Sequence, residues 1–424
     1  MGKTLSEKIL LKHTDADDIE PGEIIMVRCD VVMANDISGP VAFREMARMG
    51  ATKVFDPSKV VMVADHFMPA KDVKSAELQK ILKEWSRDQG VAFYDQGRGG
   101  IEHAVLVEDG WVVPGSVVVG GDSHTCTHGA LGAFGTGLGS TDVAAALVFG
   151  EFWQGVPATI QITYTGEKAR FVSGKDLILA VIAEIGVGGG TDHALEFVGP
   201  GAEALTVDER LAVANLAVEA GSEVGLFPAD DITGAYLDGR TDRSWERLSS
   251  DENAEMARRL TIDLDTLEPL IALPHSPGNV VTLDEAKGIP IDQAYIGNCS
   301  NGTLTDLRQA AEVLRGRQIH DNCRAIIVPA SQKIYRAAMA EGLLDVFVEA
   351  GAVVSTPTCG ACFGGGMGIL AAGERVLATT NRNFKGRKGS RHAEVHLGNA
   401  WVAAAAAVAG EIVDPADVLD GVPA

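Results

Sequence analysis

Three short runs of β-branched and apolar residues constrain the fold of this chain most strongly. They read KVVMVADH (59–66), SVVVGGDSH (116–124) and RAIIVPAS (324–331), and each ends in polar residues. Helical patterns lie between such runs, for example at 74–90 and 307–317. Apolar strands that alternate with helices are typical of parallel sheets covered by helices on both faces. The sequence therefore predicts an α/β protein with doubly wound parallel sheets.

The order of these patterns indicates three regions. With 424 residues, the chain is long enough for several domains with buried cores. A glycine-rich stretch closes the first region and a proline-rich stretch closes the second. We therefore expect α/β domains at 1–152, 153–284 and 285–424. The charged segment 248–260 is expected at the surface.

Charge and cysteine content exclude several classes of protein. The formal net charge is −22, which repels nucleic acid and anionic membranes. Six cysteines in a chain of this length are too few for a disulfide scaffold. The amino-terminal sequence has no long apolar run of the kind found in signal peptides, and the apolar stretch 401–410 is too short to span a bilayer. A cytoplasmic location is expected.

Two cysteines lie two residues apart in STPTCGACFGGGMG (355–368), at Cys359 and Cys362. Such a pair can form a redox disulfide, half of a zinc site, or two ligands of an iron–sulfur cluster. Cys299, in YIGNCSNG, is predicted at a corner between a strand and a helix, where the helix dipole would lower the thiol pKa. A small buried hydrophobic residue is the alternative for Cys299.

The other cysteines help to distinguish the redox, zinc and iron–sulfur interpretations of this pair. A zinc site needs a fourth ligand, which Cys29, Cys126 or Cys323 could supply. A thioredoxin-like pair leaves Cys299 unexplained. Three thiolates suit an iron–sulfur cluster in which one iron has no protein ligand, and spacing alone leaves the three readings open. Cys29, Cys126 and Cys323 are otherwise expected to be buried, with Cys126 near the site.

Histidines and carboxylates follow the ends of predicted strands. The chain places Asp65 beside His66, His103 in GIEHA (100–104), and Asp122 two residues before His124. A neighbouring carboxylate fixes the tautomer of a histidine and raises its basicity. One histidine at a strand end is most often structural, whereas three favour acid–base chemistry. Asn215 and Glu219 are four residues apart on one predicted helix face, which is a weak indication by itself.

Five cations lie within ten residues in TTNRNFKGRKGSR (379–391), and they are Arg382, Lys385, Arg387, Lys388 and Arg391. Arginine side chains bind carboxylates through two parallel hydrogen bonds, so this loop is a candidate carboxylate clamp. A solvated run of charge is the usual alternative. The stretch GAFGTGLGS (132–140) does not match a dinucleotide-binding fingerprint and is expected to be a packing turn before a buried helix.

Taken together, the motifs resemble the aconitase superfamily over essentially the whole chain. The motifs that show this likeness are ADH, GDSHTCTHGALGAFGTG, IGNCSNG, TCGACFGGGMG and NRNFKGR. The chain is most similar to the large subunits shared by isopropylmalate isomerases and homoaconitases. The resemblance implies three α/β/α domains of the aconitase iron–sulfur type, without the swivelling fourth domain. It also implies a [4Fe–4S] cluster held by Cys299, Cys359 and Cys362.

The resemblance implies roles for further residues. It places proton transfer on Asp65, His66, His103, Asp122, His124 and Glu219, with Glu219 beside the substrate-bound iron. It places substrate carboxylates on Asn35, Ser123, Arg382 and Arg387, and hydrogen bonds near the cluster on Asn215 and Asn381. Three positions depart from the pattern. Asn35 stands where relatives often have Gln or His, GIEHA differs from the Cys-His-Gln of many relatives, and Asn298 stands where Ser or Thr is more usual.

The resemblance also implies a partner and a substrate class. A separate small subunit, in a heterodimer or heterotetramer, is expected to supply the swivelling domain, so the chain alone is expected to be inactive. The substrate is expected to be a hydroxy di- or tricarboxylic acid that is dehydrated and rehydrated. Isopropylmalate of leucine biosynthesis is favoured over homocitrate, methylmalate or dimethylmalate. A cluster-sensing RNA-binding protein and a zinc- or disulfide-based oxidoreductase are the competing classes.

Overall fold

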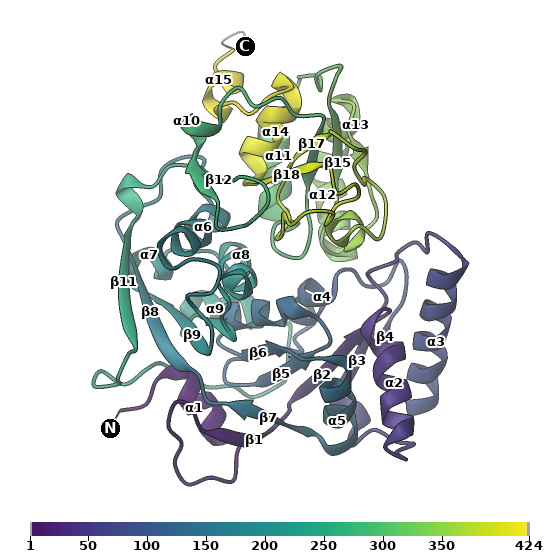
Figure 1. The fold of residues 1–424 in the computed structure, drawn as a ribbon, viewed down its shortest axis with the longest axis vertical. Coiled ribbons are helices and arrows are strands. Elements are labelled where there is room, and N and C mark those ends of the chain that lie inside the picture. Colours follow the sequence, from purple (N-terminus) through teal and green to yellow (C-terminus); the bar gives the residue numbers. More distant parts are fainter. Residues whose placement is uncertain (1, 422–424) are drawn as a thin grey trace.

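The computed structural model describes residues 2–421, in which three larger β-sheets and one two-stranded sheet organise the chain (Figure 1). The first sheet has the strand order β4-β3-β2-β5-β6, and every neighbouring pair is parallel. Its strands are β2 (Val31–Asn35), β3 (Val60–Val63), β4 (Ala92–Tyr94), β5 (Val117–Gly120) and β6 (Phe134–Gly137).

Alternate residues of these strands enter two different cores, which explains why the strands are apolar throughout. Val32 and Val60 pack in one core and Val31 and Val61 in the other. The first core contains residues of α1 (Leu5–Lys12), α2 (Ser38–Arg48), α3 (Val73–Gln89) and α5 (Ser140–Phe149). The second contains residues of α4 (Glu102–Glu108) and the 3-10 segment η2 (Ser123–Leu131). An antiparallel ribbon, β1 (Ile24–Arg28) with β7 (Glu151–Gly155), lies beside this sheet.

The second sheet is parallel throughout, with the order β10-β9-β8-β11. Its strands are β8 (Ala158–Thr165), β9 (His193–Val198), β10 (Val224–Leu226) and β11 (Arg258–Asp263). The helical segments of this part are α6 (Gly174–Ile185), α7 (Pro200–Glu203), α8 (Val207–Asn215), η3 (Leu216–Ala220), α9 (Asp231–Leu237) and η4 (Leu264–Thr266). Residues of α6 share one core with this sheet and with one face of the third sheet.

The third sheet has the order β13-β12-β18-β17-β14-β15-β16. Strand β12 runs antiparallel to both of its neighbours, and the other pairs are parallel. The strands are β12 (Leu270–Ala272), β13 (Val280–Thr282), β14 (Gln293–Ile296), β15 (Arg324–Ile327), β16 (Val353–Val354), β17 (Arg375–Ala378) and β18 (Glu394–Leu397). Its helical segments are α10 (Leu283–Ala286), α11 (Leu304–Leu314), α12 (Gln332–Ala340), α13 (Leu343–Glu349), η5 (Gly360–Phe363), α14 (Ala400–Ala409) and α15 (Pro415–Leu419). One further 3-10 segment, η1 (Pro57–Lys59), directly precedes β3 of the first sheet.

The parallel α/β architecture predicted from the sequence is confirmed. Strands β3, β5 and β15 lie within the three apolar runs, and α3 and α11 overlap the two predicted helices. One local prediction was wrong. The stretch 132–140 contains β6 before α5 begins, because its backbone pairs with β5 at the edge of the first sheet. The segment 248–260 is mostly exposed, and its last residues begin the edge strand β11.

The division into three domains at residues 152 and 284 stays a prediction. Strands β12 and β13 precede residue 284 in the chain and lie in the third sheet. Within residues 2–421, the helices are all too short or too polar to cross a membrane. The alanine-rich α14 is almost entirely buried against α11 and the third sheet.

Candidate functional site

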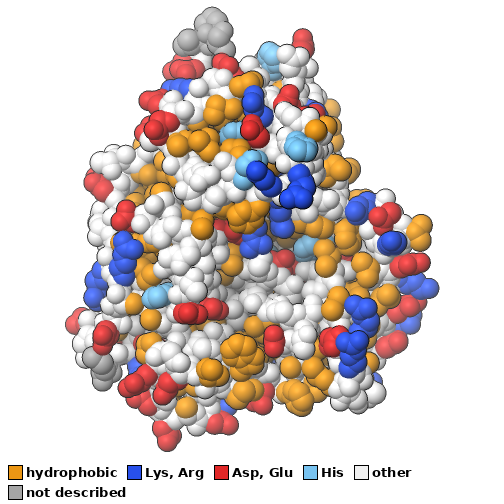
Figure 2. All heavy atoms as spheres, in the orientation of Figure 1, with side chains coloured by type: hydrophobic (Ala, Val, Ile, Leu, Met, Phe, Trp, Pro, Cys, Tyr) orange, Lys and Arg blue, Asp and Glu red, His pale blue; other side chains and the backbone are white. Residues whose placement is uncertain are grey.

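The carboxyl ends of strands from the first and third sheets meet at the candidate site. Asp65 follows β3 and Asp122 follows β5, while Cys299 follows β14 and Asn381 follows β17. Ligands of parallel α/β proteins bind at such strand ends. Backbone hydrogen bonds join the two edges, for example from the N–H of Ile101 to the carbonyl of Ala330 at 2.8 Å. The face drawn in Figure 2 is hollowed near its centre, and Lys and Arg side chains gather along the upper side of the hollow.

His66 is held by a carboxylate at each ring nitrogen. Its Nδ1 lies 2.6 Å from Oδ1 of Asp65, and its Nε2 lies 3.5 Å from Oδ2 of Asp122. The second oxygen of Asp65 accepts a hydrogen bond from the backbone N–H of Glu102 at 2.8 Å. Burial acts to lower the pKa of His66, but the charge of Asp65 and the hydrogen bonds outweigh it and raise this pKa well above its usual value.

Asp122 is shared by three histidines. Its Oδ1 lies 2.9 Å from Nε2 of His103 and accepts from the backbone N–H of His124 at 2.7 Å, and its Oδ2 faces His66. Asp122 also caps the first turn of η2, which fixes the start of the segment that presents His124. Burial acts to raise the pKa of Asp122, but the hydrogen bonds from the histidines lower it well below its usual range.

A third pair joins His124 to Glu219. Nε2 of His124 lies 3.0 Å from Oε1 of Glu219, and Nε of Arg382 donates to the same oxygen at 2.6 Å. Burial would raise the pKa of Glu219, but His124 and Arg382 lower it overall. The site thus brings side chains from all three sheet regions into one chain of ion pairs.

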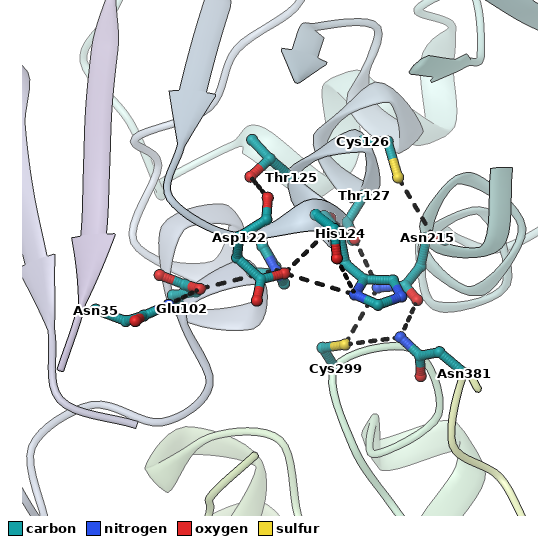
Figure 3. A network of polar contacts seen from close by, with 12 residues as sticks. Asn35, Glu102, Asp122, His124, Thr125, Cys126, Thr127, Asn215, Cys299 and Asn381 are labelled. Carbon is teal, nitrogen blue, oxygen red and sulfur yellow. Dashed lines mark hydrogen bonds and ion pairs between the residues drawn. The ribbon is translucent and has the colours of Figure 1, made fainter. Parts of the chain in front are cut away.

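Cys299 lies at the meeting point of two asparagines. Its Sγ accepts from Nδ2 of Asn215 at 3.3 Å and from Nδ2 of Asn381 at 3.2 Å, and Nδ2 of Asn381 also donates to Oδ1 of Asn215 at 2.6 Å (Figure 3). The prediction that a helix start lowers the pKa of the Cys299 thiol was wrong. Cys299 lies several residues before the start of α11, too far for the helix dipole to act strongly. The thiol is buried, and burial raises its pKa.

Cys359 immediately precedes η5 and Cys362 lies within it, on the side of the site facing Asp65. The backbone N–H of Cys359 donates to the carbonyl of Asp65 at 3.0 Å. Nε of Arg387 donates to the carbonyl of Cys362 at 3.0 Å. A hydrogen bond from Cys359 and the charges of Arg387 and Lys388 lower the pKa of the Cys362 thiol well below its usual value. The glycines around them allow positive φ at Gly360 and Gly364.

The other cysteines lie outside this group of three. Cys29 and Cys126 are buried, as predicted, and Sγ of Cys126 donates to the backbone carbonyl of Asn215 at 3.3 Å (Figure 3). Cys323 is half-exposed, contrary to the expectation that it is buried, because it lies in the turn before β15. Within residues 2–421 all six thiols are free.

The candidate carboxylate-binding residues lie in different settings. Arg382 and Arg387 face the site, while Lys385 and Arg391 are exposed. Ser123 is exposed beside His124, with its Oγ 3.4 Å from Nδ1 of that ring.

Asn35 differs from the other candidate carboxylate-binding residues, because its amide is already occupied. Its Oδ1 accepts from the backbone N–H groups of Ile37 and Ser38, and its Nδ2 donates to Glu102.

Several buried charged residues at the site were not singled out from the sequence. Glu102 lies between Asn35 and His103, and Asp36 accepts from the backbone N–H groups of His66 and Phe67. Lys175 is buried and donates to the carbonyl of Thr380 at 3.0 Å. In the sequence, only the glutamate beside His103 in GIEHA could have pointed to this buried acid. Acidic residues are rarely buried unless they are paired, so its burial was not expected.

Comparison with known proteins gives consistent results. The family model for aconitase (aconitate hydratase) matches residues 7–410. A protein of Rubrobacter xylanophilus named 3-isopropylmalate dehydratase large subunit 2 is 71% identical, with 99% of each chain covered. A 3-isopropylmalate dehydratase large subunit of Acetivibrio thermocellus is 50% identical, over 98% of this chain and 99% of the relative. The crystal structure of Thermococcus kodakaraensis aconitase X shares the fold, with a TM-score of 0.52, 15% identity, and coverage of 90% and 89% of the two chains.

Proposed function

Because the chain belongs to the aconitase family, we propose that it is the large subunit of a 3-isopropylmalate dehydratase. Such a hydro-lyase isomerises a hydroxy dicarboxylic acid by removing water and adding it back at the neighbouring carbon. One observation supports this best. Three histidine–carboxylate pairs lie where the strand ends of two sheets meet, and the three cysteine thiols are close enough to one another and to Asp65 and Asp122 to interact electrostatically. Acid–base groups and soft metal ligands in one place suit a metal-assisted elimination of water.

We propose that Cys299, Cys359 and Cys362 hold a [4Fe–4S] cluster. Thiolates are the usual ligands of such clusters, and the donor set fits. The Nδ2 groups of Asn215 and Asn381 donate to Cys299, and Arg387 and Lys388 offset negative charge at Cys362. When bound, the cluster would supply a Lewis-acidic iron for the hydroxyl group of the substrate. A zinc site would need a fourth ligand, but Sγ of Cys126 is hydrogen-bonded to the carbonyl of Asn215, and Cys29 and Cys323 precede β2 and β15, at the opposite ends of these strands from the site.

The chain's own residues provide the proton transfers. His66 has a carboxylate near each ring nitrogen and Nε2 of His124 lies against Glu219, so these carboxylates orient both rings. Asp122 stays ionised and stabilises the protonated forms of His66 and His124, whose pKa values are raised. We propose that His66, His103 and His124, with Asp65, Asp122 and Glu219, hold and return the protons that dehydration and rehydration require.

Arginines provide recognition of the substrate carboxylates. Arg382 uses its Nε to bind Glu219 and keeps its two terminal amino groups for a ligand, and Arg387 does the same with the carbonyl of Cys362. The formal net charge of the chain is −22, which repels a doubly charged dicarboxylate substrate. A local pair of guanidinium groups is therefore needed to hold it. Ser123 and Asn35 stay predicted carboxylate-binding residues.

The names of the relatives indicate that a small subunit completes the enzyme. We propose that this chain pairs with such a subunit in a heterodimer or heterotetramer, and that it is inactive alone. Homocitrate, methylmalate and dimethylmalate are the alternative substrates. A cluster-sensing RNA-binding protein is disfavoured by the net charge of −22.

The proposal is tested by reconstitution. The chain is loaded anaerobically with iron and sulfide, mixed with the small subunit, and assayed with each hydroxy acid for formation of the unsaturated acid. We expect about four irons per chain, no turnover without the small subunit, and the highest kcat/KM for 3-isopropylmalate. A higher kcat/KM for another acid would overturn the substrate assignment. Retention of zinc in place of iron would overturn the cluster assignment.

A further inference from the structure

Glu102 is a buried acid whose place in the site has no assigned role. It is the first residue of α4, and only 1% of the residue is exposed. Its backbone N–H holds Asp65, and its side-chain Oε1 accepts from Nδ2 of Asn35 at 2.9 Å. This bond joins strand β2, which carries Asn35, directly to the start of α4.

Two carboxylates and two histidines surround the side chain of Glu102. Oε1 lies 3.9 Å from Nε2 of His103, the same nitrogen that lies 2.9 Å from Asp122 (Figure 3 shows Glu102 on the side of Asp122 away from Asn215). Within residues 2–421, Oε2 of Glu102 has no hydrogen-bond partner. The titratable groups that face Glu102 are Asp65, Asp122, His66 and His103.

These contacts favour a protonated carboxyl group. Burial is the largest effect on Glu102, and the negative charges of Asp65 and Asp122 act in the same direction, so its pKa is well above the usual range for glutamate. A single neutral amide donor, from Asn35, does not compensate a buried negative charge.

We propose that Glu102 is a positioning residue of the acid–base network, acting through His103 as a reserve of one proton. The proposal rests on the hydro-lyase function proposed above. When the Nε2–H bond of His103 breaks and its proton passes by way of Asp122 to the departing hydroxyl group, the O–H bond of Glu102 breaks and a new N–H bond forms at Nε2; for this second transfer the 3.9 Å between Oε1 and Nε2 must shorten to hydrogen-bond distance in the substrate complex. Glu102 is then a carboxylate. During rehydration the proton taken from water returns to Glu102 by the reverse path, so that the balance closes over one turnover.

The Glu102→Gln variant tests this. Glutamine keeps the oxygen that accepts from Asn35 and keeps the side chain neutral, but it has no proton to exchange. In the reconstituted enzyme we expect kcat to fall at least about 10-fold, KM to change less than about 2-fold, and the alkaline side of the kcat profile to move. Glu102→Asp keeps an exchangeable proton on a shorter side chain and should recover part of the lost kcat.

Glu108→Gln is the matched control on the same helix. Glu108 accepts from Ser331 and lies outside the histidine network, so its variant should keep the wild-type kcat and pH profile. If Glu102→Gln also keeps both, Glu102 is only structural and the proposal is overturned.

A second measurement separates this proposal from the proposed function. Side-chain nitrogen resonances of His103 are followed against pH in the cluster-free chain by nuclear magnetic resonance. We expect Glu102→Gln to change this response and Glu108→Gln to leave it as in the wild type. If the reconstituted enzyme dehydrates none of the hydroxy acids but Glu102→Gln still changes the pH response of His103, the enzyme assignment fails and the proton sharing between Glu102 and His103 stands. If the responses of Glu102→Gln and wild type coincide, the proton sharing fails whatever the activity.

Discussion

The backbone N–H of Cys359 donates to the carbonyl oxygen of Asp65 at 3.0 Å, so the proposed cluster loop and the proposed base are joined directly. Oγ1 of Thr358 donates to the same oxygen at 2.9 Å. The separation between a thiol ligand and the His66–Asp65 pair is therefore set by hydrogen bonds to one peptide group. Loops that are placed in this way lose less entropy when a ligand orders them.

This contact gives the first prediction. Thr358→Val removes one of the two donors to Asp65 and keeps the shape of the side chain. We expect the free energy of unfolding to fall by about 1 kcal/mol in urea titrations and iron to be lost faster from the loaded chain. Thr356→Val, in the same loop, is the control, because Thr356 only accepts a hydrogen bond from Gln332. Equal iron loss from the two variants would contradict the prediction.

Asp65→Asn tests the orientation of His66. The amide can present its N–H to Nδ1 of His66, which favours the wrong tautomer, and it removes the negative charge that raises the histidine pKa. We expect kcat to fall by about 10²- to 10⁴-fold with little change in KM. Asp88→Asn, at an exposed position of α3, should leave both constants unchanged. A kcat within about 3-fold of wild type would show that Asp65 does not orient the base.

Asn215→Asp tests the environment of Cys299. The carboxylate replaces an Nδ2 donor with a negative oxygen beside the sulfur, and like charges in a buried site repel. We expect fewer irons per chain after reconstitution and a shorter half-life of the loaded chain against a chelator. Asn322→Asp carries the same change at an exposed position and should load like the wild type. Normal loading of Asn215→Asp would remove this asparagine from the ligand environment.

Lys388 gives a prediction for the cluster-free chain. Its Nζ is buried, lies 3.4 Å from the centroid of the Tyr295 ring, and has no hydrogen-bond partner among residues 2–421. Burial lowers its pKa from 10.5 to about 7, so the unfolded chain binds this proton more tightly than the folded chain. The resulting loss of stability grows as pH falls from 10.5 to about 7 and is constant below that.

Lys388→Met should therefore stabilise the cluster-free chain on the order of 4 kcal/mol at pH 7, and by less than about 1 kcal/mol near pH 10. The measurement is urea unfolding at both pH values, with the exposed Lys385→Met as the control. The same variant should load iron less well, because a charge that offsets the thiolates is lost. A stabilisation of equal size at both pH values would show that packing, not charge, explains the effect.

The general position of the site could be predicted from the sequence because strand ends follow simple rules. Asp65 and Asp122 follow apolar parallel strands, and the carboxyl ends of such strands lie at one edge. The facing of the first and third sheets could not be predicted, because it depends on long-range contacts such as that between Ile101 and Ala330.

Two errors have physical causes. The pKa of Cys299 was expected to fall near a helix start, but burial is the larger effect, and the helix begins only at Leu304. The stretch 132–140 was expected to be a packing turn, yet hydrogen bonding of its backbone to β5 forms the strand β6 there, despite the low strand propensity of glycine. Glu102 was missed because its neighbours Asn35 and His103 come from separate segments that only the fold brings together.

Asp122 couples the three histidines that it contacts, so that none of them can be altered independently of the other two. A single carboxylate contacts His66, His103 and His124, so a substitution at any of them alters the electrostatic environment of the other two. The effects of mutations in such a cluster are not additive. The loss of kcat caused by a substitution at one of these histidines is therefore expected to depend on which residues occupy the other two positions.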